Sequence, residues 1–192
     1  MIEPPPRPDR AHLRELIDRL SRVVASEGWG ADLNPVQRAA LAYLARANRF
    51  SRAPSNVADY LLATRGTVSQ TLRALARKGL VVERRSETDR RSIAYALTEE
   101  GERLADSADA LDHAIDALDG EAVERMGDDL AGLLRGVLGA RGGRSFGVCR
   151  TCRHHREAGA PAGGAWCALL DVALTPDEAQ RICHEHAWAD AA

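Results

Sequence analysis

The stretch of residues 64–97 constrains the fold most, because its apolar residues change from a helical to an extended spacing within a few positions. In its first part, three apolar residues recur at the spacing of one helix face: Val68, Leu72 and Leu75. Gly79 ends this pattern. The runs 80–82 and 93–97 then have the composition of two short strands joined by a charged stretch. The sequence therefore predicts a helix followed directly by a β-hairpin.

Two further helices are expected before this stretch. Leucine, isoleucine and valine recur at helical spacing between residues 13 and 24, which predicts a first helix. Asn34, Pro35 and Gln37 form a strong start for a second helix. The asparagine side chain can accept free backbone amides, proline fits the first turn, and glutamine stands at the capping-box position. We expect this helix to run to about Asn48.

A short third helix would complete a helix-turn-helix. Ser55 or Asn56 can cap it, and it is expected to run through Ala63. The helix that follows carries small, polar and basic residues opposite its apolar stripe, which permit close approach to a DNA major groove and offer donors to base edges. The basic hairpin after it predicts a wing that can place arginines along or in the minor groove.

Charge is distributed unevenly along the chain, although the net charge is only -2. Residues 65–91 hold eight Lys and Arg residues against three acidic residues. Residues 99–129 hold twelve acidic residues against two arginines. The first segment suits contact with a polyanion, and the second does not.

Residues 67–101, TVSQTLRALARKGLVVERRSETDRRSIAYALTEEG, resemble the core of the MarR family of transcriptional regulators. The resemblance rests on the order of K-G-L-V at the helix end, D-R-R in the hairpin and L-T-x-x-G at the start of the next helix, and it extends more weakly over about residues 10–140. It implies a mainly α (α+β) winged helix-turn-helix fold. It also implies a homodimer that binds double-stranded DNA at pseudo-palindromic operators, usually as a repressor relieved by a small ligand or by oxidation. No nucleophile and base stand together as a pair, so we do not expect an enzyme.

The resemblance also implies which residues contact DNA. On the second helix of the helix-turn-helix, the residues that would contact bases or nearby phosphates are Thr67, Ser69, Gln70, Arg73 and Arg77. In the wing, the corresponding residues are Arg84, Arg85, Asp89, Arg90 and Arg91. Asp89 would orient a neighbouring arginine, because an unpaired carboxylate at a phosphate surface would weaken binding. We expect at least one of the four wing arginines to be only a solubilising surface charge.

Helices on both sides of this domain carry apolar faces, which the family resemblance assigns to subunit pairing. Thr98 caps the segment that begins at Glu99, and Gly120 is expected to break this segment in two. The predicted organisation is an N-terminal dimerisation helix (1–33), a winged helix-turn-helix domain (34–98), dimerisation helices (99–140) and a cysteine-rich extension (141–192).

A small-molecule effector is possible, but the scattered aromatic residues fit a core better than a pocket and no effector site can be identified. No apolar run approaches the roughly 20 residues of a membrane span, and the N-terminus lacks the features of an export signal. We therefore expect a cytoplasmic protein without membrane contact, in which thiols stay reduced.

All four cysteines lie within the last 44 residues, in the pattern C-x2-C-x14-C-x15-C, at Cys149, Cys152, Cys167 and Cys183. Unligated cysteines have no reason to cluster, so the pattern predicts one metal centre per chain. Zinc is the leading candidate and an iron-sulfur cluster is a close alternative. A nearby histidine could replace one cysteine ligand, and the candidates are His154, His155, His184 and His186. The remaining alternative is four unligated thiols in a mobile tail.

The extension has too few apolar residues to fold alone, so a metal is expected to fasten it to the dimerisation helices. Three functions follow. In the first, a repressor changes its operator affinity with the redox or metal state of the centre. In the second, a repressor has a purely structural zinc and a small-molecule inducer. In the third, the Cys/His tail serves as a protein-interaction module.

Overall fold

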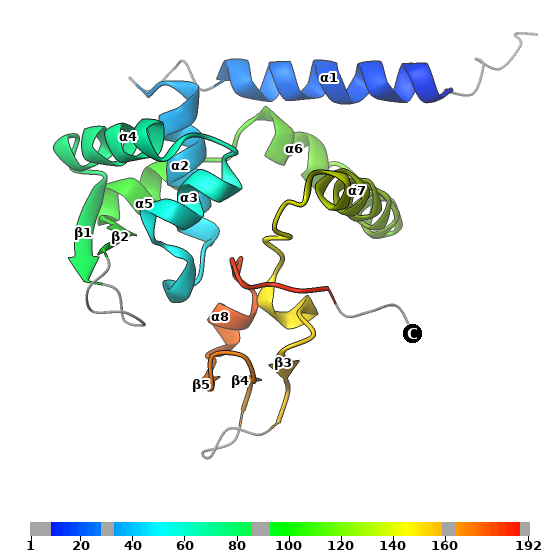
Figure 1. Cartoon of the computed structure of the whole chain (residues 1–192). Coiled ribbons are helices and arrows are strands. Elements are labelled where there is room, and N and C mark those ends of the chain that lie inside the picture. The colour runs from blue at the N-terminus through cyan, green and yellow to red at the C-terminus, as the bar shows by residue number, and fades with distance from the viewer. Residues whose placement is uncertain (1–8, 28–32, 86–92, 159–163, 189–192) are drawn as a thin grey trace, which may run out of the picture.

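The computed structural model describes residues 9–27, 33–85, 93–158 and 164–188. Its first part holds the elements α1 (Arg10–Glu27), α2 (Pro35–Arg46), α3 (Pro54–Tyr60), α4 (Arg65–Arg77), β1 (Val81–Arg85), β2 (Ile93–Leu97) and α5 (Glu99–Ala105) (Figure 1). Two further helices follow, α6 (Ala110–Asp116) and α7 (Gly120–Arg141). The C-terminal extension holds β3 (His155–Arg156), β4 (Trp166–Cys167), β5 (Val172–Ala173) and α8 (Pro176–Ala179). Two 3-10 turns, η2 (Arg49–Ser51) and η3 (Cys149–Thr151), complete the structure.

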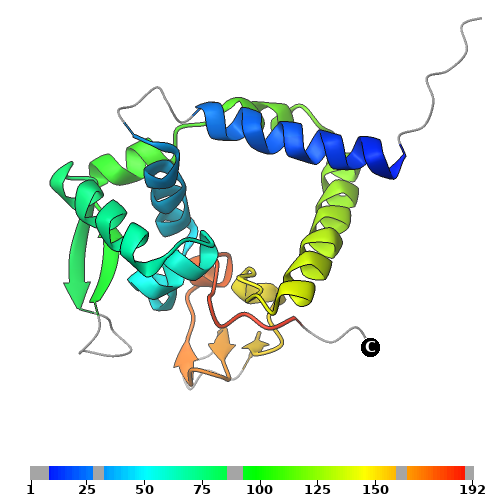
Figure 2. The ribbon, with the colours of Figure 1, turned by 45° about the horizontal axis from the view of Figure 1, so that its top comes forward.

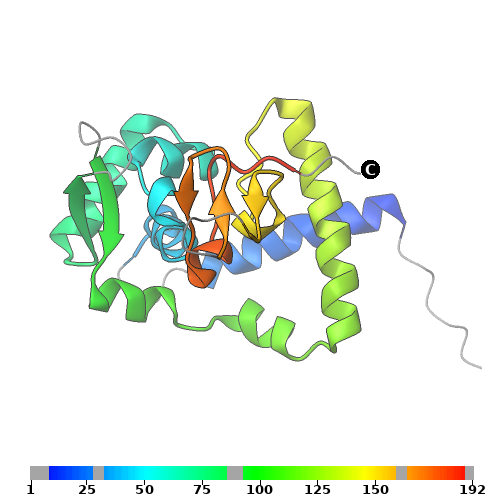
Figure 3. The same ribbon diagram turned by 90° about the horizontal axis from the view of Figure 1, so that it is seen from below.

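These elements are arranged in four parts. The winged-helix domain, formed by α2 to α5 with the β1–β2 hairpin, lies on one side, α7 lies opposite it, and α1 and the extension lie along the two remaining sides (Figure 2). Seen from below, the extension lies between the winged-helix domain and α7 (Figure 3). In the described part of the chain, no helix is both long enough and apolar enough to cross a bilayer.

The start of α2 confirms the predicted capping box. The Asn34 side chain accepts a hydrogen bond from the Gln37 amide (2.9 Å), and the Gln37 side chain accepts one from the Asn34 amide (3.3 Å). The helix ends at Arg46, slightly earlier than expected, because Ala47 is already extended. Asn48 instead caps η2, where its side-chain oxygen accepts a hydrogen bond from the Phe50 amide (3.1 Å).

The predicted cap of α3 is wrong. Ala53 holds the N-cap position without any side-chain hydrogen bond, and Pro54 is the first helical residue. Ser55 and Asn56 lie inside the helix, because proline suits the first turn and sets the start of the helix there.

The core of the winged-helix domain forms where α2, α3, α4, β1 and β2 meet. Val68, Leu72 and Leu75 are fully buried, as their spacing predicts. Gly79 adopts a positive φ of 72° directly after α4, a conformation that glycine adopts without steric cost. The chain then turns into β1, which pairs antiparallel with β2.

The segment after Thr98 forms three helices instead of the two expected. The predicted break before α7 is confirmed, since α7 begins at Gly120. An additional break precedes α6, where Asp109 caps the helix by accepting hydrogen bonds from the amides of Leu111 and Asp112 (2.9 and 3.0 Å). Asp109 also lies 3.4 Å from the Arg38 guanidinium, so this cap is tied to α2.

None of residues 10–26 of α1 and none of the residues of α7 is buried within this single chain. Both nevertheless carry large apolar side chains that are exposed. On α1 these are Leu13, Leu16, Leu20 and Val23, and on α7 they are Val123, Met126, Leu130, Leu133, Leu134 and Val137.

The extension forms a small three-stranded antiparallel sheet in the order β3-β4-β5, followed by α8. Its docking differs from the expectation. Ile182 joins the core of the winged-helix domain, and its amide and carbonyl pair with backbone groups of Arg46 and Asn48. The extension also contacts α7, where the Arg135 guanidinium lies 4.4 Å from the centre of the Trp188 ring.

Candidate DNA-binding surface and cysteine cluster

Helix α4 is held by its own cap and by its apolar stripe. The Thr64 hydroxyl accepts a hydrogen bond from the Thr67 amide (3.1 Å), which fixes the first turn. With the stripe buried, the opposite side of the helix is left at the surface. Thr67, Gln70, Arg73 and Arg77 are exposed there, whereas Ser69 is half-buried.

The hairpin lies directly after this helix. Arg84 and Arg85 are exposed on β1, opposite Ala94 and Ile93 of β2. The predicted wing residues Asp89, Arg90 and Arg91 lie outside the described residues. Strand β2 is attached to the rest of the domain by the Tyr95 amide, which donates to the Arg52 carbonyl oxygen (3.0 Å).

The charge on α4 suits an anionic partner. The sequence has no Asp or Glu between residues 60 and 82, so α4 itself carries no acidic residue. A helix of this kind can enter a major groove, where arginine and glutamine can hydrogen-bond to base edges. Exposed arginines on the adjacent hairpin can neutralise phosphates and add a salt-dependent contribution to affinity.

Three of the four cysteines lie together in one buried cluster. Cys149, Cys167 and Cys183 are buried in one cluster with Phe50 and Leu174. Cys152 is half-buried, and its sulfur accepts a hydrogen bond from the Ala187 amide (3.4 Å). Among the described residues, no group of three or more His, Cys, Asp or Glu side chains is arranged so as to hold a metal ion.

The electrostatics of the cluster favour neutral thiols as long as no cation is present. Burial is the main cause that raises the pKa of Cys149 to about 12, and the neighbouring sulfurs of Cys183, Cys167 and Cys152 contribute to this shift, because a second thiolate would repel the first. Burial also raises the pKa of Cys183. A metal cation would offset the repulsion between buried thiolates, because thiolates are the form that binds metals.

Polar groups of Asn48, Glu185 and Ser51 lower the pKa of the Cys183 thiol and so oppose the effect of burial. Asn48 and Ser51 belong to the winged-helix domain and are 1% and 0% exposed. Neither residue was expected near Cys183, since both lie more than 130 positions earlier and no local pattern links them to the tail.

Two of the four candidate histidines are engaged in hydrogen bonds through both ring nitrogens. His186 contacts the Ser145 and Thr151 hydroxyls (2.9 and 3.1 Å), and burial lowers its pKa. His184 contacts the Ser51 hydroxyl (3.2 Å) and Glu185 (3.0 Å), and burial lowers its pKa as well.

The other two histidines lie around β3. His154 accepts a hydrogen bond from Arg153 (3.4 Å). His155 pairs with Cys167 across β3 and β4, and its Nδ1 is buried with no hydrogen-bond partner among the described residues. His155 is therefore the histidine best placed to supply a nitrogen beside the sulfurs.

Comparison with known proteins supports the winged-helix assignment. Residues 31–92 match the MarR family, and this segment ends before the cysteine-rich extension. Comparison with curated proteins finds no match.

Solved structures of similar fold include MepR of Staphylococcus aureus in its DNA-binding conformation, with a TM-score of 0.53 and 24% identity over 65% of this chain and 95% of that chain. The complex of MepR with DNA has a TM-score of 0.50 and 23% identity over 68% and 99% of the two chains. FabT of Streptococcus pneumoniae in complex with DNA has 25% identity over 66% and 93%, with a TM-score of 0.49. The chain is therefore similar to the MarR family over residues 31–92, and its fold is similar to that of MepR.

Proposed function

We propose that this chain is a sequence-specific DNA-binding regulator that acts as a repressor and binds double-stranded DNA as a homodimer. The observation that carries the proposal is the exposed face of α4, which presents Thr67, Gln70, Arg73 and Arg77 beside a basic hairpin and lacks acidic residues. In this proposal α4 enters the major groove and Arg84 and Arg85 follow the backbone towards the minor groove. The repressor role follows from the family resemblance.

Replacement of Arg73 by alanine tests this placement. We expect Arg73→Ala to weaken binding to an operator duplex by roughly tenfold or more and to relax specificity at one base position. Arg22→Ala is the matched control, because Arg22 is exposed on α1, away from the proposed surface. Fluorescence polarisation at several salt concentrations measures both variants. Unchanged affinity of Arg73→Ala, with an unchanged salt dependence, would remove α4 from the DNA interface.

The homodimer in this proposal is formed by the exposed apolar faces of α1 and α7. A single chain leaves both faces in water, and apolar surface of this extent marks an interaction site. A second copy of the chain would cover them and would place two α4 helices for the two halves of a pseudo-palindromic operator.

We further propose that Cys149, Cys152, Cys167 and Cys183 bind one zinc ion per chain, with an iron-sulfur cluster as the close alternative. The burial of three of these sulfurs in one cluster supports the proposal, as does the hydrogen bond donated to the sulfur of Cys152. The described residues do not by themselves form a group that could hold the ion, so the sulfurs would have to move to bind it. Metal and acid-labile sulfide analysis, with a visible spectrum, on protein purified without oxygen distinguishes zinc, an iron-sulfur cluster and no metal.

The role of this centre is a separate question with two candidate answers. If it senses redox or metal state, a Cys149→Ser/Cys152→Ser protein loses the dependence of operator affinity on oxidation or metal. If the metal is purely structural, chelation lowers thermal stability but leaves operator affinity unchanged at temperatures where the protein stays folded.

A small-molecule inducer is the second candidate for control of DNA binding. A cavity of about 690 Å³ lies between α3 and the end of α7, and its lining includes Tyr60, Leu134, Leu138 and Phe146. Its size suits a drug-sized ligand. This alternative would be favoured if a compound weakens operator binding by the wild type but has no effect on Leu138→Trp, whose side chain fills the cavity.

A further inference from the structure

A second cavity, of about 570 Å³, lies where the C-terminal end of α7 meets the extension. Figures 2 and 3 show these two parts of the chain side by side. One wall of the cavity comes from the last turns of α7, a second from residues 143–145 and 153–154, and a third from residues 184–188. The cavity differs from the one beside α3, because its lining comes from the extension and not from α3. Its size suits a small organic molecule.

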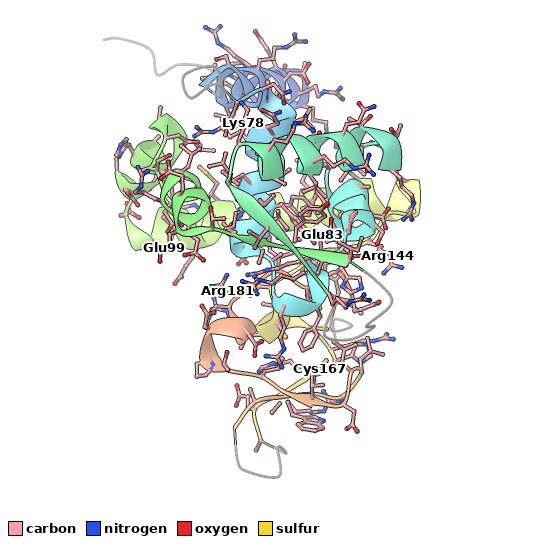
Figure 4. All side chains as sticks on the ribbon, turned by 90° about the vertical axis from the view of Figure 1, so that its left-hand side faces the viewer. Lys78, Glu83, Glu99, Arg144, Cys167 and Arg181 are labelled. Atoms are coloured by element: carbon pink, nitrogen blue, oxygen red, sulfur yellow. The ribbon has the colours of Figure 1, made fainter. Side chains whose placement is uncertain are left out.

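The charged side chains that line this cavity are unbalanced. Three of them are arginines, Arg135, Arg144 and Arg153, and one is a carboxylate, Glu185. Arg144, labelled in Figure 4, forms an ion pair with Glu185 (3.4 Å). Among the described residues, no carboxylate pairs with Arg135 or Arg153. The lining therefore carries an excess of positive charge that comes from these two guanidinium groups.

The Arg135 side chain is held in place by Trp188. Its guanidinium lies over the Trp188 ring, 4.4 Å from the ring centre, and His186 meets the same ring edge-to-face at 4.7 Å. His186 is itself held by the hydroxyls of Ser145 and Thr151 (2.9 and 3.1 Å). A guanidinium that lies over a ring uses its face for that contact, so the N–H groups along its edge can still donate hydrogen bonds.

Arg153 lines the same cavity from the extension. Its amide donates to the Ala187 carbonyl oxygen (2.9 Å), which places it beside the segment that carries Trp188. Its Nε donates to the His154 ring (3.4 Å), and no acceptor among the described residues meets its two terminal NH2 groups. Arg135 and Arg153 therefore offer free N–H donors from two walls of one cavity.

The cavity lies on the side of α7 that faces away from the proposed dimer interface. The exposed apolar side chains of α7 gather on the helix face around Leu130. Because a helix turns by about 100° per residue, Arg135 lies about 140° and Gly139 about 180° around α7 from Leu130. A second copy of the chain that covers the apolar face would therefore leave the cavity open.

We propose that this cavity binds a small phosphomonoester, whose phosphate group accepts hydrogen bonds from Arg135 and Arg153. A phosphomonoester carries close to two negative charges at pH 7 and has three acceptor oxygens, so one group can meet both guanidinium edges. A carboxylate has a single charge and would neutralise only one of the two arginines. Leu169 and Trp188 supply apolar surface for the organic part of the ligand. The site goes beyond the proposed DNA binding and does not depend on whether the cysteines bind a metal.

Calorimetric titration of the full chain with phenyl phosphate at neutral pH tests the proposal. We expect saturable binding. Inorganic phosphate, which lacks the apolar part, should bind more weakly, and phenol, which lacks the charge, should not bind. Phthalate, a dicarboxylate, should also bind more weakly, because each of its carboxylates carries one charge. Arg135→Gln and Arg153→Gln each remove one guanidinium, and we expect each to weaken phenyl phosphate binding by about tenfold or more.

Arg141→Gln and Arg150→Gln are the matched controls. Arg141 is exposed at the end of α7 and Arg150 is exposed in η3, and neither residue lines the cavity. Each control removes one positive charge from the same element or segment as its test variant, so we expect both to bind phenyl phosphate as the wild type does. Far-UV circular dichroism checks that all four variants are folded.

Weaker binding in Arg135→Gln and Arg153→Gln, with unchanged controls, would support the site. The proposal would be overturned if the wild type shows no saturable binding of phenyl phosphate, if either test variant keeps wild-type affinity, or if the controls lose as much affinity. Tighter binding of phthalate than of phenyl phosphate would overturn the phosphate assignment. Equal affinity for inorganic phosphate would overturn the role of the organic part. None of these outcomes bears on whether α4 binds DNA.

Discussion

Among the glycines that the structure describes, Gly101 is the one at which an added methyl group would make the closest contact. A Cβ atom built at Gly101 would lie 2.0 Å from the carbonyl oxygen of Leu80, which belongs to the backbone and cannot move aside alone. The glycine of the L-T-x-x-G pattern thus allows α5 to pack against the start of β1. We expect Gly101→Ala to lower the free energy of unfolding by at least about 2 kcal/mol, measured by urea denaturation.

Gly132→Ala is the control for that substitution. A Cβ atom there would meet no described heavy atom within 4 Å, and alanine favours a helix, so we expect a gain of about 0.5–1 kcal/mol or no change. If both variants lose the same free energy of unfolding, the close approach of Gly101 to Leu80 does not explain the loss.

Asp109 makes a contribution to the free energy of unfolding that depends on pH. The Asp112 amide, with the Leu111 amide and Arg38, holds the pKa of Asp109 below its ordinary value of 3.8. The stabilisation by the ionised Asp109 side chain is therefore fully present above the pKa of this group in the unfolded chain. It is lost as the pH falls through the lower pKa of the group in the folded chain. We expect Asp109→Asn to be less stable than the wild type at neutral pH and the difference to vanish in strong acid. A difference that stays constant across this range would contradict the assignment.

At the scale of elements, the exposed apolar faces of α1 and α7 are the feature to test. Leu130→Lys would place a charge within the α7 face, and we expect it to convert the dimer into a monomer in light-scattering measurements, because burying an unpaired charge at the interface is unfavourable. Asp128→Lys introduces the same side chain on the opposite side of α7 and should leave the dimer intact. A dimer that survives Leu130→Lys would place the subunit interface elsewhere.

Element by element, local signals predicted this structure well and long-range contacts could not be predicted. The capping box at Asn34 and the stripe of α4 involve residues three or four positions apart, and the structure confirms both. The cap of α3 was wrong because Pro54 outweighs the polar residues after it. The break before α6 was missed because it depends partly on the contact of Asp109 with Arg38, 71 positions away.

At the scale of the whole molecule, the extension connects parts that are far apart in the sequence. It contacts residues 45–48, at the end of α2, through Ile182 and Arg181, and it contacts α7 through Trp188, whose ring lies beside Arg135. The cysteine spacing predicted one metal centre, and the structure places three of the four sulfurs in one buried cluster. The spacing could not predict that Phe50 packs with them, because that contact arises only once both parts are folded.

The measurement that tests the account most directly is selection of bound duplexes from a random-sequence DNA pool by the full chain. We expect enrichment of an inverted repeat whose half-sites lie about one helical turn apart, since two α4 helices of a symmetric dimer would read them. Arg73→Ala should lose this enrichment. No enriched sequence with the wild-type chain, or the same repeat enriched by Arg73→Ala, would contradict the claim that α4 reads DNA.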